Sequence, residues 1–498
     1  MNITPMFFVA AFPSFLLIAG AIITLLTKND KDRGNFHLIV SFLCLIITLV
    51  LMFFTILNPR RELFYNILFS ASQYVLIVLI FTFQFVFSVF IKYTSNNYPY
   101  AYIFDVFTFL IYFSFIGIIV SINLITLVSF FIFALILIGM NFYFGEFYKE
   151  FRLLKKYFFA SCICALLLIS ATIIFVIDTG TTNIYHLEGT TMSDVANSLV
   201  SILLILGFGV PCGLFPFYVF HLKRYFQESN YFHLITYIAF NFVSTLTIIR
   251  LSNSIFTLFP GISLVLLIFS GLGITITLYY IILELFTSHD GFTYSIKKIL
   301  GYSVIGDSNL IFFLFMNFHL FPAPHMNNLL NLLIFLIGAL ILVKLIFVIS
   351  FLQAANNSNE DNFRLLGNFW KNEKIFGFFL LFSGLILIFP ICFLFIYSFL
   401  ENYEFVYTFL NSLTSMISII SIIMLLLSFS IALLYISHIF VQTYISKNTS
   451  YLERENPHII NKKIVYFLGI LVFGMLIAMV IIYFSVPGWY LGLITAYY

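Results

Sequence analysis

The chain has 498 residues, of which 62% are hydrophobic and 9% charged, with a net charge of +3. Its mean hydropathy is +1.09. This composition excludes a soluble domain of this length and indicates a polytopic helical membrane protein. The near-neutral charge, with basic residues dispersed at helix ends, argues against a nucleic-acid partner. The five cysteines all fall in apolar segments without a metal-ligand pattern, so we predict neither a metal site nor a disulfide.

Apolar stretches long enough to cross about 30 Å of hydrocarbon recur from end to end. We predict about fourteen spans, roughly at 6–27, 37–57, 73–94, 101–120, 122–143, 156–177, 196–220, 232–250, 256–284, 299–319, 328–352, 375–400, 408–440 and 464–486. The prediction is an all-α fold with a single transmembrane domain over residues 1–498. Its expected parts are three N-terminal helices (1–100), a first repeat (101–250), a second repeat (251–440) and a C-terminal helix (441–498).

The basic residues divide unevenly between the two sides of the predicted bundle. Nineteen of the 23 Lys and Arg residues lie in connections after odd-numbered spans, while Arg60, Arg61 and Arg250 lie after even-numbered spans. The positive-inside rule then places both termini on the side opposite the cytoplasm-like one. Four basic pairs are predicted to be interfacial anchors, with binding of cardiolipin or another anionic lipid as the alternative. They are Arg60–Arg61, Lys155–Lys156, Lys297–Lys298 and Lys462–Lys463.

Two predicted spans carry helix-breaking residues. The seventh contains Pro211, Gly213 and Pro216, and the twelfth contains Pro390 near its middle. Proline removes a backbone donor and crowds the preceding turn, so a helix breaks or kinks there. Because the two breaks are five spans apart, we predict two inverted five-helix repeats, spans 4–8 and 9–13, each with one broken helix. The alternative is a proline-kinked packing helix with no ion near it.

Ionisable residues at membrane depth are functional candidates, and few are present. Lys344 lies more than two turns from either end of its apolar segment, which makes it a candidate proton-path residue. The alternative is a lysine that snorkels to the polar end of its span. Glu284, near the end of the ninth span, is a second candidate, although an interfacial position is favoured. Asp105 and Asp307 lie near the starts of their spans and are expected to cap or end helices.

Four stretches, in this order and spacing, resemble the antiporter-like subunits of respiratory complex I, specifically NADH dehydrogenase subunit 2. The first begins with Lys156-Tyr157-Phe158 and ends with Thr179-Gly180. The second is Gly213-Leu214-Phe215-Pro216-Phe217. The third runs from Lys298 to Gly306, and the fourth from Phe363 to Gly367 followed by Phe382-Ser383-Gly384. The resemblance covers essentially the whole chain and implies fourteen helices with the seventh and twelfth broken.

The chain departs from this family at its charged positions. The family's fifth-helix glutamate falls at about Phe131–Ile132, and its lysines of the seventh, eighth and twelfth helices fall at Pro211, near Asn241 and near Ile396–Tyr397. None of these side chains is acidic or basic. The charged proton-transfer chain of the family therefore does not carry over. The resemblance, with these departures, implies a mainly structural subunit whose own proton path is degraded, and proton translocation through the chain is the alternative.

The resemblance implies a membrane-arm subunit of a proton-pumping NADH:ubiquinone oxidoreductase in the mitochondrial inner membrane, with both termini facing the intermembrane space. It implies a non-redox subunit that binds no cofactor itself, with flavin and iron–sulfur clusters in partner subunits. The expected partners are other membrane-arm subunits and phospholipids. Two alternatives stay open: subunit 4 or a sodium/proton antiporter subunit, and a stand-alone secondary transporter. The transporter would need polar groups near Pro211 and Pro390, and both neighbourhoods are apolar.

Overall fold

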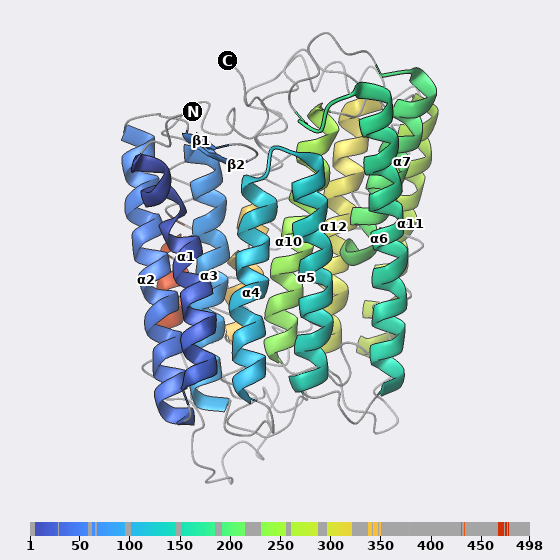
Figure 1. Ribbon diagram of the computed structural model, residues 1–498. Helices are drawn as coiled ribbons and strands as arrows, with labels where there is room; N and C mark the ends of the chain where they lie inside the picture. Colours follow the sequence, from blue (N-terminus) through green and yellow to red (C-terminus); the bar gives the residue numbers. More distant parts are fainter. Residues whose placement is uncertain are drawn as a thin grey trace. The chain divides into compact units, whose positions relative to one another are not determined.

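The computed structural model describes residues 5–27, 29–57, 62–64, 67–94, 101–145, 151–184, 192–214, 231–254, 260–286 and 296–320, with short stretches within 337–349 and 467–477 and the single residues 378, 430 and 433. This part forms ten long helices and one hairpin (Figure 1). They are α1 (Pro5–Leu26), α2 (Asp30–Leu57), β1 (Glu62–Phe64), β2 (Ile67–Phe69), α3 (Ala71–Thr94), α4 (Ala101–Val120), α5 (Leu124–Gly145), α6 (Phe151–Thr179), α7 (Asp194–Cys212), α10 (Tyr231–Ser254), α11 (Pro260–Phe286) and α12 (Ile296–Leu320).

These helices coincide with the first ten predicted spans, and the nearly all-helical membrane fold is confirmed. Seven helices in the described part are long and apolar enough to cross a membrane. Helical residues within 337–349 and 467–477 fall in the predicted eleventh and fourteenth spans. Most of the last four spans lies outside the described residues, so the count of fourteen and the inverted repeats stay predictions.

The chain divides into two compact units. The first unit comprises Met1–Pro211, Ile235–Phe259 and Val480–Tyr498, and the second comprises Cys212–Leu234 and Pro260–Met479. In the first unit α1 packs on α2 and α4, α3 packs on the same two helices, and α5 packs between α4 and α6. In the second unit α11 packs along α12. The four sequence divisions predicted above stay predictions.

Glycines let neighbouring helices approach closely. A Cβ atom added to Gly207 of α7 would lie 2.5 Å from Leu168 Cδ2 of α6, and one added to Gly117 of α4 would lie 2.6 Å from the Phe130 ring of α5. Beside the contact of Gly207 with Leu168, the Cys164 thiol of α6 donates a hydrogen bond to the Gly207 carbonyl over 2.9 Å. Lipid tails are as apolar as leucine, so membrane helices associate through close packing and such polar contacts. The positions of these glycines therefore select which helices pair.

The family-like motif of α6 has a packing role. The Tyr157 ring packs against Gly139 of α5, so closely that a Cβ atom added to this glycine would lie 2.8 Å from the ring. The Tyr157 hydroxyl donates to the Leu135 carbonyl of α5 over 2.9 Å. At the other end, Gly180 has a φ of 64° and its N–H donates to the Val176 carbonyl over 2.9 Å. A left-handed glycine is a usual helix terminator. The motif thus fixes α6 on α5 and ends the helix.

The helices differ in what surrounds them. α3 is buried from Gln73 to Val89, and α10 is buried from Leu234 to Leu251. By contrast α6 exposes large apolar side chains, Phe159, Leu166, Ile169, Ile173 and Ile177, at intervals of about one or two turns. Such spacing forms one stripe along a helix. Because the chain is a membrane protein, this stripe is a surface suited to lipid.

Candidate functional site

The strongest candidate site is a buried ion pair in the second unit. Lys344 Nζ lies 3.2 Å from Asp307 Oδ2 of α12, and it also donates a hydrogen bond to the Ser303 hydroxyl one turn earlier on α12. The Lys344 side chain is 3% exposed and the Asp307 side chain 26% exposed. Lys344 therefore pairs inside the protein instead of snorkelling.

The position of Asp307 corrects the sequence prediction. It lies near the middle of α12 and so neither caps nor ends a helix. Ser303 and Asp307 are four residues apart, which places them on the same face of α12. An ammonium group and a carboxylate in contact at membrane depth lower each other's desolvation cost. Chemically, the pair can hold one proton on either partner.

Within the second unit, the residue that follows α7 is hydrogen-bonded to α12. The helix ends at Cys212, one residue after Pro211, and Gly213 follows with a φ of 68°. Asn309 of α12 donates from Nδ2 to the Gly213 carbonyl over 3.3 Å and to the Ile305 carbonyl over 2.8 Å. In a bilayer a carbonyl released at a helix end needs a partner inside the protein, and Asn309 supplies it. A resumption of the helix beyond this point lies outside the described residues, so the interruption stays a prediction.

A cluster of phenylalanines occupies the region where the resemblance places the family's charges. Phe131 of α5 meets Phe208 of α7 edge-on with ring centroids 4.6 Å apart, and its centroid is 5.2 Å from that of Phe240 on α10. Phe115 of α4 stacks on Phe240 at 5.7 Å. All four rings are at most 3% exposed. This aromatic cluster is apolar and contains no group that can hold a proton.

Arg250 has a structural role. It lies inside α10, four residues before the helix ends, and is buried. Its guanidinium group donates to the carbonyls of Ile118 over 3.3 Å, Ile119 over 2.8 Å and Ser121. These carbonyls lie at the C-terminal end of α4, where the last turn has no helical donors. Arg250 therefore caps α4 rather than lying in a connection as predicted.

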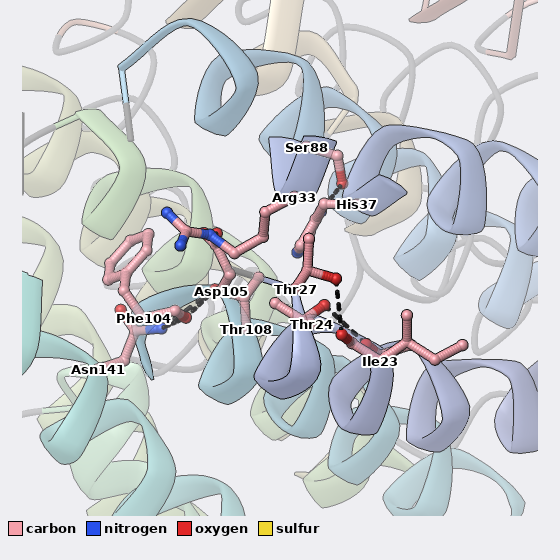
Figure 2. A network of polar contacts seen from close by, with 11 residues as sticks. Ile23, Thr24, Thr27, Arg33, His37, Ser88, Phe104, Asp105, Thr108 and Asn141 are labelled. Carbon is pink, nitrogen blue, oxygen red and sulfur yellow. Dashed lines mark hydrogen bonds and ion pairs between the residues drawn. The ribbon is translucent and has the colours of Figure 1, made fainter. Parts of the chain in front are cut away.

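A second buried ion pair was missed at the sequence level. Arg33 Nε of α2 lies 2.7 Å from Asp105 Oδ2 of α4, with side chains 3% and 0% exposed (Figure 2). The prediction that Asp105 caps or ends a helix is wrong, because it lies five residues into α4 and pairs with Arg33. Arg33 is one of the nineteen basic residues predicted to lie in connections after odd-numbered spans, and it lies inside α2 instead. The spacing of Arg33 and His37, four residues apart on one helix face, was the signal that could have revealed it.

The remaining predicted residues divide into three groups. Lys155 and Lys156 are exposed near the start of α6. Glu284 lies in the last turn of α11, and Lys297 and Lys298 lie in the first turn of α12, with side chains outside the described set. Arg60, Arg61, Pro216, Pro390, Lys462 and Lys463 lie outside the described residues altogether. Among the side chains that are described, no three His, Cys, Asp or Glu residues gather as a metal site would require.

Comparisons of sequence and of structure give different results. No protein-family model matches the chain, and no curated protein sequence matches it. Among solved structures, it is similar to a chain of the membrane-bound sulfane sulfur reductase, an archaeal respiratory membrane complex, with a TM-score of 0.69 at 14% identity, covering 98% of this chain and 96% of the other. It is also similar to a chain of respiratory complex I from Thermus thermophilus, with a TM-score of 0.64 at 12% identity, covering 96% and 99%. Over nearly its whole length, the protein has the fold of these chains from two respiratory membrane complexes.

Proposed function

We propose that this chain is a membrane-arm, antiporter-like subunit of a respiratory complex of the NADH:ubiquinone oxidoreductase type, most similar to subunit 2. The observation that carries the proposal is the fold, which covers almost the full length of both this chain and its two structural neighbours. The ordered motifs of the sixth, seventh, tenth and twelfth spans favour subunit 2. The mitochondrial inner membrane, and termini in the intermembrane space, belong to the same proposal.

The proposed contribution of the chain is mainly structural. The aromatic cluster of Phe115, Phe131, Phe208 and Phe240 is closely packed where the resemblance expects a glutamate and lysines. A proton path needs groups that accept and release a proton, joined by water. Buried phenylalanine rings provide neither. The first unit thus supplies closely packed apolar rings at the place where the family would carry charge.

The Lys344–Asp307 pair is the candidate for any proton transfer that the chain retains. It brings together an acid and a base at membrane depth, within 3.2 Å. The chain itself would bind no flavin or iron–sulfur cluster, and those groups would belong to partner subunits. Membrane-arm subunits and phospholipids, including cardiolipin, are the proposed partners.

Affinity purification tests the assembly. An epitope tag on this chain should copurify a flavin- and iron–sulfur-containing complex that oxidises NADH and migrates as one band on a native gel. Recovery of the chain alone would contradict the proposal and favour a stand-alone transporter. Recovery with a complex that reduces sulfur without oxidising NADH would place it in the other type of respiratory complex.

The proton-to-electron ratio tests the structural role. The purified complex in liposomes should translocate fewer protons per electron than a relative that carries a charged residue at all four family positions. Lys344→Met and Asp307→Asn should leave that ratio unchanged, as should the control Lys155→Met at an exposed lysine. An equal ratio that falls in both pair variants but not in the control would show that protons pass through this chain.

A further inference from the structure

The first four helices contain a buried polar group apart from the aromatic cluster. On α2, His37 lies one turn after Arg33, and both are at most 3% exposed. Arg33 pairs with Asp105 of α4, while His37 Nδ1 lies 2.8 Å from Ser88 Oγ of α3. Figure 2 shows these two side chains reaching toward their partners on α4 and α3. Three helices therefore contribute polar side chains to one region.

The contact with Ser88 occupies one ring nitrogen of His37 and leaves the other, Nε2, with one of two roles. The Ser88 hydroxyl lies 2.7 Å from the Gln84 carbonyl and 2.6 Å from the Ser41 hydroxyl, so its single proton goes to one of these oxygens or to His37 Nδ1. A neutral imidazole has one donor and one acceptor nitrogen. If Nδ1 donates to Ser88, then Nε2 is a buried acceptor; if Nδ1 accepts, then Nε2 is a buried donor. In both cases Nε2 makes no well-aligned hydrogen bond among the described residues, where the ring has only a weak contact with the backbone of Asp105.

Two more polar groups on adjoining turns share this situation. Both amide atoms of Gln84, one turn before Ser88 on α3, are buried without a hydrogen-bond partner in the described part of the chain, and so is the Tyr112 hydroxyl of α4. The ring of Phe109, three residues before Tyr112, stacks on His37 at 4.0 Å. Tyr112 itself meets Phe87 of α3 edge-on at 6.3 Å. These contacts bring the three groups to neighbouring turns of α2, α3 and α4.

Buried polar groups in proteins are almost always satisfied, either by the protein or by ordered water. Gln84 requires both a donor and an acceptor, and His37 and Tyr112 each require one more partner. Water is the small molecule that both donates and accepts, and a polar region with two to four partners is where it binds. We propose that α2, α3 and α4 enclose an internal water-binding site in which His37 Nε2, the Gln84 amide and the Tyr112 hydroxyl bind ordered water.

The site differs in kind from the aromatic cluster of the same unit. Its ionisable neighbours, Arg33 and Asp105, neutralise each other, and α1, which packs on α2 and α4, carries no ionisable residue. Water beside an imidazole allows that ring to exchange protons, as polar groups in membrane interiors do in relay sites. The first unit therefore holds a hydrated group on helices where the resemblance places no charge, independently of the proposed function.

Radiolytic footprinting of the intact protein in its native membrane tests the proposal. X-ray pulses convert ordered water into hydroxyl radicals that oxidise adjacent side chains, which mass spectrometry then locates. Phe109 and Phe131 form a matched pair, since both are phenylalanines with 0% exposure. Phe109 and Tyr112 should be oxidised several-fold faster than Phe131. Equal rates for Phe109 and Phe131 would overturn the proposal.

Variants make the test specific. Gln84→Leu removes the amide, so oxidation of Phe109 should fall to the rate of Phe131. The control Gln73→Leu makes the same exchange at another buried glutamine of α3 and should leave Phe109 unchanged. His37→Phe keeps an aromatic ring against Phe109 and should lower the oxidation of Phe109 as much as Gln84→Leu does. It replaces Gln84→Leu in the test if that variant does not assemble. Undiminished oxidation of Phe109 in Gln84→Leu or His37→Phe would contradict a site built from these groups.

Discussion

Removing either charge of the Lys344–Asp307 pair should destabilise the protein, but by a different amount for each residue. At 3.2 Å the gross attraction of two unit charges is about 5 kcal/mol with an effective dielectric constant of about 20. Removing one member of a buried pair costs about 3–5 kcal/mol, because the remaining charge is left buried without its partner. The cost depends on which charge remains.

The exposed fractions of the two side chains decide which substitution costs more stability. Asp307→Asn leaves the ammonium group of Lys344, whose side chain is 3% exposed, without a counter-charge. We expect a cost of about 3 kcal/mol, at the low end because the site is not sealed on the Asp307 side. Lys344→Met leaves a carboxylate that is 26% exposed and can be hydrated, so about 1.5 kcal/mol is expected. The double variant Lys344→Met/Asp307→Leu replaces both charges and should cost less than either single change.

Hydrogen exchange measured by mass spectrometry on the intact protein resolves this locally, since amide exchange reports the free energy of opening of each segment. Every 1.4 kcal/mol corresponds to a factor of ten. Amides of Ile296–Leu320 should therefore exchange about 100-fold faster in Asp307→Asn and about 10-fold faster in Lys344→Met. Amides of Ala101–Val120, in the first unit, serve as the internal control. Unchanged exchange in Asp307→Asn, or a larger effect in Lys344→Met, would refute the reasoning.

Three further predictions concern substitutions in the first unit, and the last of them has a control in the second unit. Arg250→Lys should destabilise the end of α4 by about 2–3 kcal/mol, because a single nitrogen on a shorter side chain replaces the two guanidinium nitrogens that reach the three carbonyls, and hydrogen exchange of residues 118–121 should accelerate. Phe131→Glu should abolish the assembled protein on a native gel, whereas Phe131→Leu should cost about 1–3 kcal/mol, seen as a lower thermal midpoint. Gly207→Ala should cost about 1–3 kcal/mol through overlap with α6, seen as a lower midpoint, while Gly474→Ala, whose added methyl group meets no atom within 4 Å, should lower it little or not at all.

Several features of the candidate sites could be predicted from the sequence, and others could not. Lys344 stood out because a charge in a long apolar segment is costly wherever it lies. Its partner could not be chosen, since Asp307 lies 37 positions earlier in the chain and the sequence does not state which helices pack together. For the same reason, the pairing of Asp105 with Arg33 could not be predicted from the sequence. Proximity to the start of a span suggested a cap, but both carboxylates turned out to face a basic residue of another helix.

What the sequence determined by itself is the class of fold and the first ten helices, because the length and hydropathy of each span depend only on local composition and on the thickness of a bilayer. The end of α7 was also visible, since Pro211 and Gly213 act on their own backbone. Only the tertiary structure decided which side chains meet: Asn309 on the Gly213 carbonyl, Arg250 on the end of α4, and Phe131 against Phe208 and Phe240. Those contacts depend on helix pairing and rotation, which glycines and close packing select in three dimensions.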